Sequence, residues 1–219
     1  MNPKDFNGLK TFPFMRFRFY AVWLSLLCIG VFILQMIIGG FTDVFVLNEQ
    51  SFFQPWRFLT SIFLHADILH LMFNLFALLL FGSILEKIIG GKKFLLLFFV
   101  SGIFANLMAV NFYSSSLGAS GAVYGILGCL AILRPKMAVW VYGMPMPMFI
   151  AAILWIAAGI FGLFVPSNIG HIAHLSGIGV GFIFGIYLRT RKKKPSIEFE
   201  TKFKIPETYM RDWEDTYIR

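Results

Sequence analysis

The sequence predicts an all-α, polytopic integral membrane protein, a bundle of six transmembrane helices in which the fourth is short. Three observations predict this fold class. The 219 residues are 58% hydrophobic and only 14% charged, with a mean hydropathy of +0.76, and a soluble domain of this length does not hide so much apolar surface. Six apolar runs follow one another along the chain. The basic residues behind the net charge of +8 gather at the ends of these runs, which indicates a membrane and not a nucleic acid as the partner.

The six helices are expected as separate apolar runs bounded by charged residues. The first run has basic residues before it and no small-residue cleavage site after it, which favours a retained helix over a cleaved leader. Between the first two runs, the Phe-rich segment 41–58 is expected to be an external loop in the headgroup region. The expected runs are 19–40, 59–85, 94–113, 120–133, 137–165 and 169–188.

The distribution of Lys and Arg predicts the orientation in the cell membrane. If both termini are cytoplasmic, Arg57 is the only one of the 19 Lys and Arg residues on the other side, as the positive-inside rule expects for an even number of spans. We therefore expect a cytoplasmic N-terminal segment 1–18, a membrane domain 19–188 and a basic cytoplasmic tail 189–219. The run from Arg189 to Lys194 is interpreted as an anchor on anionic lipid.

The fourth run is too short to cross a bilayer. From Ser120 to Leu133 it holds 14 residues, or about 21 Å of helix against a hydrocarbon core of ~30 Å. Its first residue, Ser120, lies in the sequence Gly118-Ala119-Ser120-Gly121. A polar side chain at such a depth is costly unless it faces protein or water, so Ser120 is a candidate functional residue that opens to the non-cytoplasmic side.

A serine hydroxyl becomes a good nucleophile only when a base takes its proton. Of the four histidines, His171 and His174 stand near the start of the sixth run, which enters from the same outer side as Ser120. Gly177, Gly181 and Gly185 follow at a spacing of four and form a small-residue ridge that lets two helices approach closely. Plain helix packing is the alternative explanation of that ridge. His174 is three residues from Gly177 and shares its face.

The second run supplies further polar groups at a similar depth. His70 and Asn74 are four residues apart and therefore share a helix face. Attack on a carbonyl group creates an oxyanion that needs hydrogen-bond donors. The His70 ring, the Asn74 amide and the Ser120 backbone N–H are candidates for that role.

These residues together resemble the motifs of the rhomboid family of intramembrane serine proteases. Each motif is weak alone, but three in this order are specific. The resemblance covers about residues 19–188, with Pro55-Trp56-Arg57 and Glu86-Lys87 as supporting features. The motifs are Gly118-x-Ser120-Gly121, His65-x-x-x-x-His70-x-x-x-Asn74 and Ala173-His174-x-x-Gly177-x-x-x-Gly181.

The resemblance implies a serine endopeptidase with a Ser–His dyad and no third, acidic member, which cuts transmembrane segments of other proteins. Ser120 would be the nucleophile and His174 the general base, while Tyr124 would pack on the His174 ring to orient it. The glycines of the motifs, Gly118, Gly121, Gly177 and Gly181, would support the site. Asp67, the only acid near these motifs, is interpreted as a surface residue. His171 remains an alternative base, because it lies three residues from His174 and can also face inward.

Three alternatives to proteolysis fit the sequence less well. A rhomboid-like protein that binds membrane proteins without cutting them would typically lack the serine or the histidine, and this chain has both. A six-helix transporter would spread polar groups across the whole membrane, whereas here they cluster in the outer half. A purely structural membrane subunit would leave that clustering unexplained.

The expected partners are transmembrane protein substrates and membrane lipids. No cofactor, metal or nucleic acid is expected, since the histidines form no ligand cluster with Cys or carboxylates, and Cys28 and Cys129 fall within apolar runs.

Overall fold

The computed structural model describes residues 19–141, 143–165 and 169–191. The chain forms two compact units, residues 1–189 and 190–219, and the fold described below is that of the first. The predicted segment 1–18 and the tail beyond residue 191 lie outside the described residues.

Within the described residues, four helical segments are long and apolar enough to cross a membrane. They are α1 (Tyr20–Ile37), the continuous run Ile68–Ile89, α6 (Gly91–Ala109) and α9 (His171–Arg191). The run Ile68–Ile89 comprises α4 (Ile68–Ala77), a π-helical turn η4 (Leu78–Gly82) and α5 (Ser83–Ile89). Two shorter apolar helices, α7 (Ser120–Leu133) and α8 (Met148–Gly162), complete the set. The chain is therefore mostly helical and has the composition of a multi-pass membrane protein.

The second helix begins later than the apolar run predicted. Residues 59–67 were expected to be helical with it, but they complete α3 (Arg57–Thr60), form the 3₁₀ turn η3 (Ser61–Phe63) and then run as an extended loop. Asp67 ends this loop, because its side chain accepts a hydrogen bond from the His70 N–H at 2.8 Å and caps α4. An acidic N-cap satisfies one of the free amides at a helix start.

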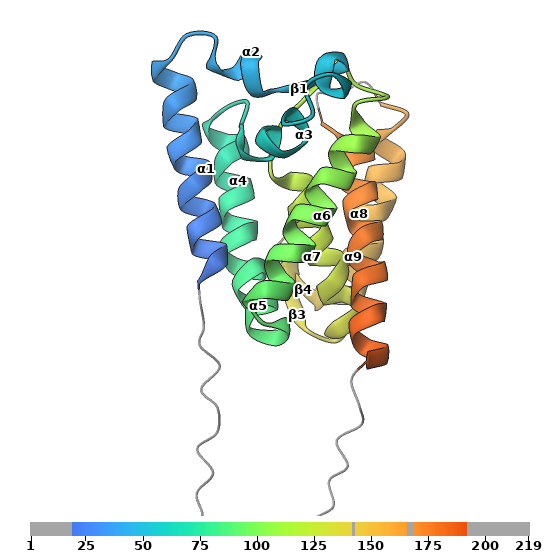
Figure 1. Cartoon of the computed structure of the whole chain (residues 1–219). Helices are drawn as coiled ribbons and strands as arrows, with labels where there is room; N and C mark the ends of the chain where they lie inside the picture. Colours follow the sequence, from blue (N-terminus) through green and yellow to red (C-terminus); the bar gives the residue numbers. More distant parts are fainter. Residues whose placement is uncertain (1–18, 142, 166–168, 192–219) are drawn as a thin grey trace, which may run out of the picture. The chain divides into compact units, whose positions relative to one another are not determined.

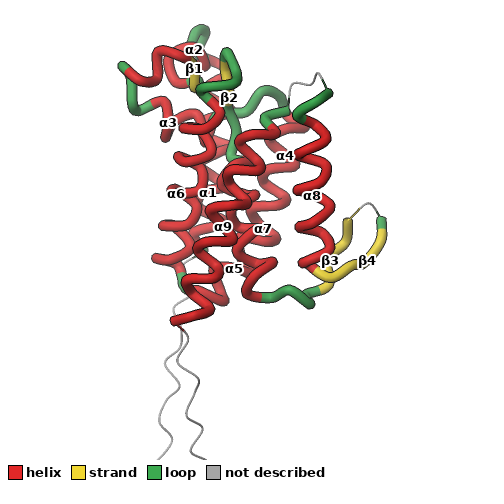
Figure 2. Tube along the Cα trace, turned by 90° about the vertical axis from the view of Figure 1, so that its right-hand side faces the viewer, coloured by secondary structure: helices red, strands yellow, loops and turns green. Residues whose placement is uncertain are grey.

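The fifth predicted run was also too long, and the fold is not purely helical. β3 (Ala138–Val141) and β4 (Met144–Pro147) pair as an antiparallel hairpin before α8 begins. Pro145 and Pro147 lack the N–H that an α-helix needs, and Gly143 has a φ of 80° that favours a turn. A second pair joins β1 (Leu47–Asn48) to β2 (Ser115–Ser116) in antiparallel register. Figure 2 shows β3 and β4 beside one end of α8.

The segment 41–58 is an ordered structure of short elements. It contains α2 (Phe41–Phe45), β1, the 3₁₀ helix η2 (Glu49–Phe52) and the start of α3. Arg57 holds these elements together: the residue is 5% exposed, and its guanidinium donates to the carbonyl oxygens of Asp43 and Val46, both at 2.7 Å. Phe52, Phe53 and Trp56 of this segment are exposed, and its position in the headgroup region stays a prediction.

The short elements mark the two ends of the bundle (Figure 1). α2, β1 and α3 lie at one end, called the α3 end below, and α5 with the β3–β4 hairpin lies at the opposite, α5 end. At the α5 end, the Glu86 carboxylate accepts hydrogen bonds from the Tyr20 and Ala21 amides at 3.1 Å each. A buried carboxylate at the first turn of α1 satisfies amides that have no partner within the helix.

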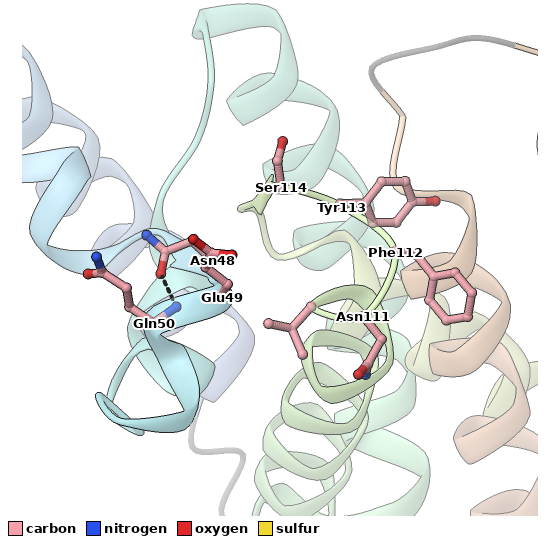
Figure 3. Close-up of a pocket in the computed structure, with 8 residues that line it drawn as sticks. Asn48, Glu49, Gln50, Asn111, Phe112, Tyr113 and Ser114 are labelled. Carbon is pink, nitrogen blue, oxygen red and sulfur yellow. Dashed lines mark hydrogen bonds between the residues drawn. The ribbon is translucent and has the colours of Figure 1, made fainter.

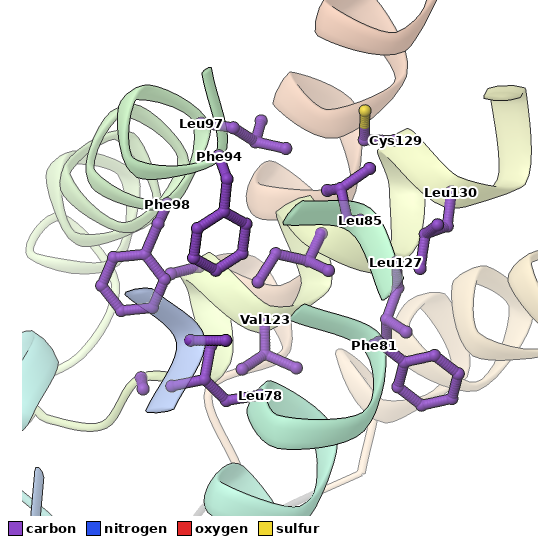
Figure 4. Packing of buried hydrophobic residues seen from close by; sticks show 14 of the residues in the cluster. Leu78, Phe81, Leu85, Phe94, Leu97, Phe98, Val123, Leu127, Cys129 and Leu130 are labelled. Carbon is purple, nitrogen blue, oxygen red and sulfur yellow. The ribbon is translucent and has the colours of Figure 1, made fainter. Parts of the chain in front are cut away.

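The core surrounds α7, of which ten residues are buried. Side chains from η4, α5 and α6 pack against it (Figure 4). The fully buried side chains of this cluster include Leu78, Leu85, Phe94, Leu97 and Phe98, together with Ile126 and Leu130 of α7 itself. The short helix is thus held in the centre of the fold, with its first residue, Ser120, inside the bundle.

Candidate active site

The structure brings Ser120 and His174 into direct contact. Ser120 opens α7, and His174 lies one turn into α9. The Ser120 Oγ lies 2.8 Å from the His174 Nε2, a normal hydrogen-bond length for this pair. In the neutral imidazole tautomer whose Nε2 carries no proton, the His174 Nε2 can accept a hydrogen bond from the Ser120 hydroxyl. The residues are 54 positions apart in the sequence, so tertiary packing of the two helices creates this contact.

Tyr124 packs on the His174 ring, and Trp155 packs on Tyr124. Tyr124, one turn along α7 from Ser120, stacks on the imidazole with ring centroids 4.2 Å apart and planes inclined by 9°. Trp155 of α8 meets the Tyr124 ring edge-on at 6.5 Å. The stack leaves the imidazole little freedom to turn about its own axis. Tyr124 was expected at this place, whereas nothing in the sequence distinguished Trp155 from the other apolar residues of its helix.

Close approach of α7 and α9 depends on glycine. A Cβ atom at Gly177 would overlap the carbonyl oxygen of Gly121, and one at Gly181 would overlap that of Gly125. These glycines form the predicted ridge, and they allow backbone-to-backbone contact of the two helices. The Ser120–His174 contact requires this separation, because a wider one would move His174 away from Ser120.

The turn before Ser120 supplies backbone donors. Gly118 has a φ of 120°, a conformation open to glycine, and its N–H donates to the Ser61 carbonyl oxygen at 2.9 Å. No side chain caps the start of α7. The first amides of a helix have no partner within it and carry partial positive charge. The Ser120 N–H is therefore well placed to stabilise a negative oxygen next to the hydroxyl.

His70 lies against this turn, and Asn74 lies below it on the same helix. A Cβ atom at Gly118 would stand 2.9 Å from the His70 Nε2, so only glycine leaves room for the imidazole. Asn74 is 6% exposed, and its Nδ2 donates to the His70 carbonyl oxygen at 2.9 Å. One hydrogen of that amide is thus used within α4, and the second is available to another acceptor.

His65 is the buried neighbour of His70. Its ring is 1% exposed and lies 5.2 Å from the His70 ring, edge to face. The Nδ1 lies 3.2 Å from the Phe63 carbonyl oxygen, which accepts only, so Nδ1 carries the proton. Burial, with a smaller contribution from His70, lowers the pKa of His65 to about 4. His65 therefore stays neutral, and its buried ring packs against the His70 ring.

His171 takes a different position from His174. Its ring lies 6.4 Å from that of His174, nearly perpendicular to it, and packs against Gly162 at the end of α8. It borders a surface cavity of about 390 Å³ together with Phe112, Tyr113, Gly162, Leu163, Phe164, Val165, Ile169 and Ile172. The structure therefore places His174, and not His171, against Ser120.

A second surface cavity, of about 460 Å³, lies between the segment 48–50 and the end of α6 (Figure 3). Its lining is largely polar and does not include the dyad. It is formed by Asn48, Glu49, Gln50, Val110, Asn111, Phe112, Tyr113 and Ser114. Among the described residues, no group of three or more His, Cys, Asp and Glu side chains is arranged to hold a metal ion.

Comparison with known proteins identifies the family. The Rhomboid domain profile matches residues 53–191, which is more than half of the chain. The chain belongs to the rhomboid family. The Rhomboid protease GlpG of Yersinia pseudotuberculosis serotype I is 30% identical over 196 residues, covering 83% of this chain and 70% of that protein. The Rhomboid protease GlpG of Haemophilus influenzae is 29% identical over 183 residues, covering 80% of this chain and 93% of that protein. The family predicted from three short motifs is thus confirmed, and these relatives are proteases by name.

Proposed function

We propose that this protein is an intramembrane serine endopeptidase that cleaves transmembrane segments of other membrane proteins with a Ser120–His174 dyad. The observation that carries the proposal is the 2.8 Å contact between the Ser120 Oγ and the His174 Nε2 in a chain of the rhomboid family. A serine paired in this way with a fixed imidazole is an activated nucleophile.

The reaction follows from the positions of these atoms. As the Ser120 Oγ attacks the scissile carbonyl carbon, its proton passes to the His174 Nε2. The C–N bond then breaks, and the imidazolium returns the proton to the leaving amine. A water molecule, deprotonated by the same nitrogen, hydrolyses the acyl ester and restores the serine. Tyr124 orients the ring, a role that an aspartate fills in a catalytic triad.

The oxyanion of each tetrahedral intermediate would lie beside Gly118 and Ser120. The Ser120 N–H, the His70 ring and the second N–H of Asn74 are the proposed donors. Removing one such donor typically costs about 2.7–4 kcal/mol of transition-state stabilisation. His65 supports His70 from behind and touches no reacting atom.

The proposed orientation has six spans, both termini in the cytoplasm and cleavage near the outer face. Lys87 on α5, Lys92 and Lys93 on the first turn of α6, and Arg134 and Lys136 before β3 all belong to the α5 end. The α3 end has Arg57, which is buried and bonded to backbone carbonyls. This asymmetry supports a cytoplasmic α5 end, and α7 and α8 would then be short spans.

Substrates would reach Ser120 as helices from the bilayer and unwind locally, since a helical peptide bond is shielded by its own hydrogen bonds. Lipids would surround the bundle, whose many exposed apolar side chains on α1, α4 and α8 suit a hydrocarbon environment.

Labelling with a fluorophosphonate tests the proposal directly. The detergent-purified protein should react at one residue, and the Ser120→Ala and His174→Ala variants should not. A matched Ser101→Ala variant, which removes a buried hydroxyl bonded to the Leu97 carbonyl within α6, should label like the wild type. Absence of label on the wild type, or equal label on Ser120→Ala, would exclude the proposed chemistry.

A further inference from the structure

Asn106 is a buried polar residue that the reaction proposed above does not use. It lies on α6, is 5% exposed, and reaches across to the segment that precedes α4. Its Nδ2 donates to the Phe58 carbonyl oxygen at 2.8 Å and to the Ser61 Oγ at 2.9 Å. Because the Phe58 oxygen can only accept, the amide nitrogen must face it. Both hydrogens of the Asn106 amide are therefore donated to acceptors within residues 58–61.

The same segment holds the turn that leads to Ser120. Ser61 is fully buried, and its Oγ donates to the Arg57 carbonyl oxygen at 2.6 Å. Its own carbonyl oxygen accepts from the Gly118 N–H at 2.9 Å. Gly118 precedes Ser120 by two residues and lies against the His70 ring. Ser61 thus links Asn106, which donates to its hydroxyl, to the turn before Ser120, which donates to its carbonyl oxygen.

We propose that Asn106 is a positioning residue for the Ser120 site. It fixes residues 58–61, so that the Ser61 carbonyl holds Gly118 and, with it, the Ser120 amide and the contact to His70. This inference rests on the proposed function, and it adds a residue on a fourth helix, α6, that touches none of the reacting atoms.

The loop between α6 and α7 explains why the turn before Ser120 depends on the Ser61 carbonyl. Residues 110–119 contain one short pairing, in which Leu47 and Asn48 face Ser116 and Ser115. That pairing holds the loop from the α3 end, and the Ser61 carbonyl holds it next to His70. Loss of the Asn106 amide would leave the Phe58 oxygen and the Ser61 hydroxyl in an apolar interior without this donor. Buried polar groups left in that way are costly, so the segment would shift to satisfy them.

The first test compares cleavage kinetics of the full chain in proteoliposomes. Asn106→Ala should lower kcat on the order of ten- to a hundredfold with little change in KM, as expected when catalytic groups are displaced by about 1 Å. Asn111→Ala removes the same amide near the end of α6, where its Nδ2 donates to the exposed Leu107 carbonyl, and should keep the wild-type kcat. An unchanged kcat in Asn106→Ala, or an equal loss in Asn111→Ala, would overturn the proposal.

A second control separates positioning from loss of stability. Ser101→Ala deletes a fully buried hydroxyl of the same helix, so it should lower the Tm without lowering kcat. A kcat that falls with Tm equally in both variants would mean that Asn106 acts through stability alone. If Asn106→Ala does not fold, Asn106→Ser, which keeps one donor, should fold and show a smaller loss of kcat.

Amide hydrogen exchange tests the proposed role of Asn106 without a measurement of activity. In Asn106→Ala the Gly118 amide should exchange at least about tenfold faster than in the wild type, because its bond to Ser61 is weakened. Ser61→Ala should give a similar acceleration, and the double variant should add little to either, since the two side chains form one unit. Unchanged exchange at Gly118, or additive effects, would overturn the inference, whereas a wild-type protein that cleaves no substrate would overturn the proposed function instead.

Discussion

The two sides of Ser120 are built differently. On the α9 side, His174 is bonded to the serine at 2.8 Å and is stacked on Tyr124. On the α4 side, His70 lies against Gly118, and the Asn74 amide donates to its own helix. The proposed base, His174, is thus hydrogen-bonded to Ser120 before any substrate binds. The proposed oxyanion donors lie near the site but make no hydrogen bond to the serine. Donors that engage only when the oxyanion forms stabilise the transition state more than the ground state.

The largest expected effect concerns the base. His174→Ala should reduce cleavage on the order of 10⁴-fold or more, because the serine then has no proton acceptor. His171→Ala is the matched control and should stay within about threefold of the wild type, since its ring packs against Gly162 and not against Ser120. Initial rates on one single-span substrate provide the comparison. The reverse pattern would make His171 the base.

On the α4 side, Asn74→Ala should lower kcat by about 10²–10³-fold with KM nearly unchanged, as for other oxyanion donors. Met72→Ala truncates an exposed side chain of the same helix and should have little effect. Steady-state kinetics in proteoliposomes separate the two constants. A raised KM at constant kcat would mean that Asn74 binds the substrate in its ground state.

A smaller effect is expected when the glycine contact between α7 and α9 is disturbed. Gly177→Ala forces a methyl group into the Gly121 carbonyl, so α7 and α9 must separate. We expect a loss of about 1–3 kcal/mol in the free energy of unfolding and about a tenfold drop in cleavage rate. Gly179→Ala meets open space and should change neither. Thermal unfolding in detergent and cleavage rates measure both quantities, and equal behaviour of the two variants would contradict the packing argument.

The smallest effect on cleavage is expected at His65, which should influence stability alone. Its pKa in the folded protein is lowered to about 4 from the usual 6.5, so between these values the unfolded chain binds the extra proton. Stability should therefore fall as the pH drops from about 6.5 to 4, by about 3 kcal/mol from this residue. His65→Gln should show a flatter pH dependence of Tm over that window. An identical slope in both proteins would contradict the buried, neutral state of His65.

The sequence predicted the family, and with it the residues now found around Ser120, because three motifs that are weak alone occur together in the family's order. It placed helix starts poorly at residues 59–67 and 137–147. Both segments are apolar like the helices beside them, and the differences lie in single residues, the Asp67 cap and the Pro145–Pro147 pair. Trp155, Ser61 and Asn106 were missed because their importance comes from partners 31, 57 and 45 positions away. Such contacts follow from tertiary packing and leave no periodic pattern in the sequence.

Cleavage of a single-span substrate in proteoliposomes, with the cut bond located by mass spectrometry, tests the central claim most directly. The account predicts one main cut in the outer half of the substrate's transmembrane segment, made by the wild type and absent with Ser120→Ala. An intact substrate with the wild type, equal cleavage by Ser120→Ala, or a cut in the cytoplasmic half would contradict it.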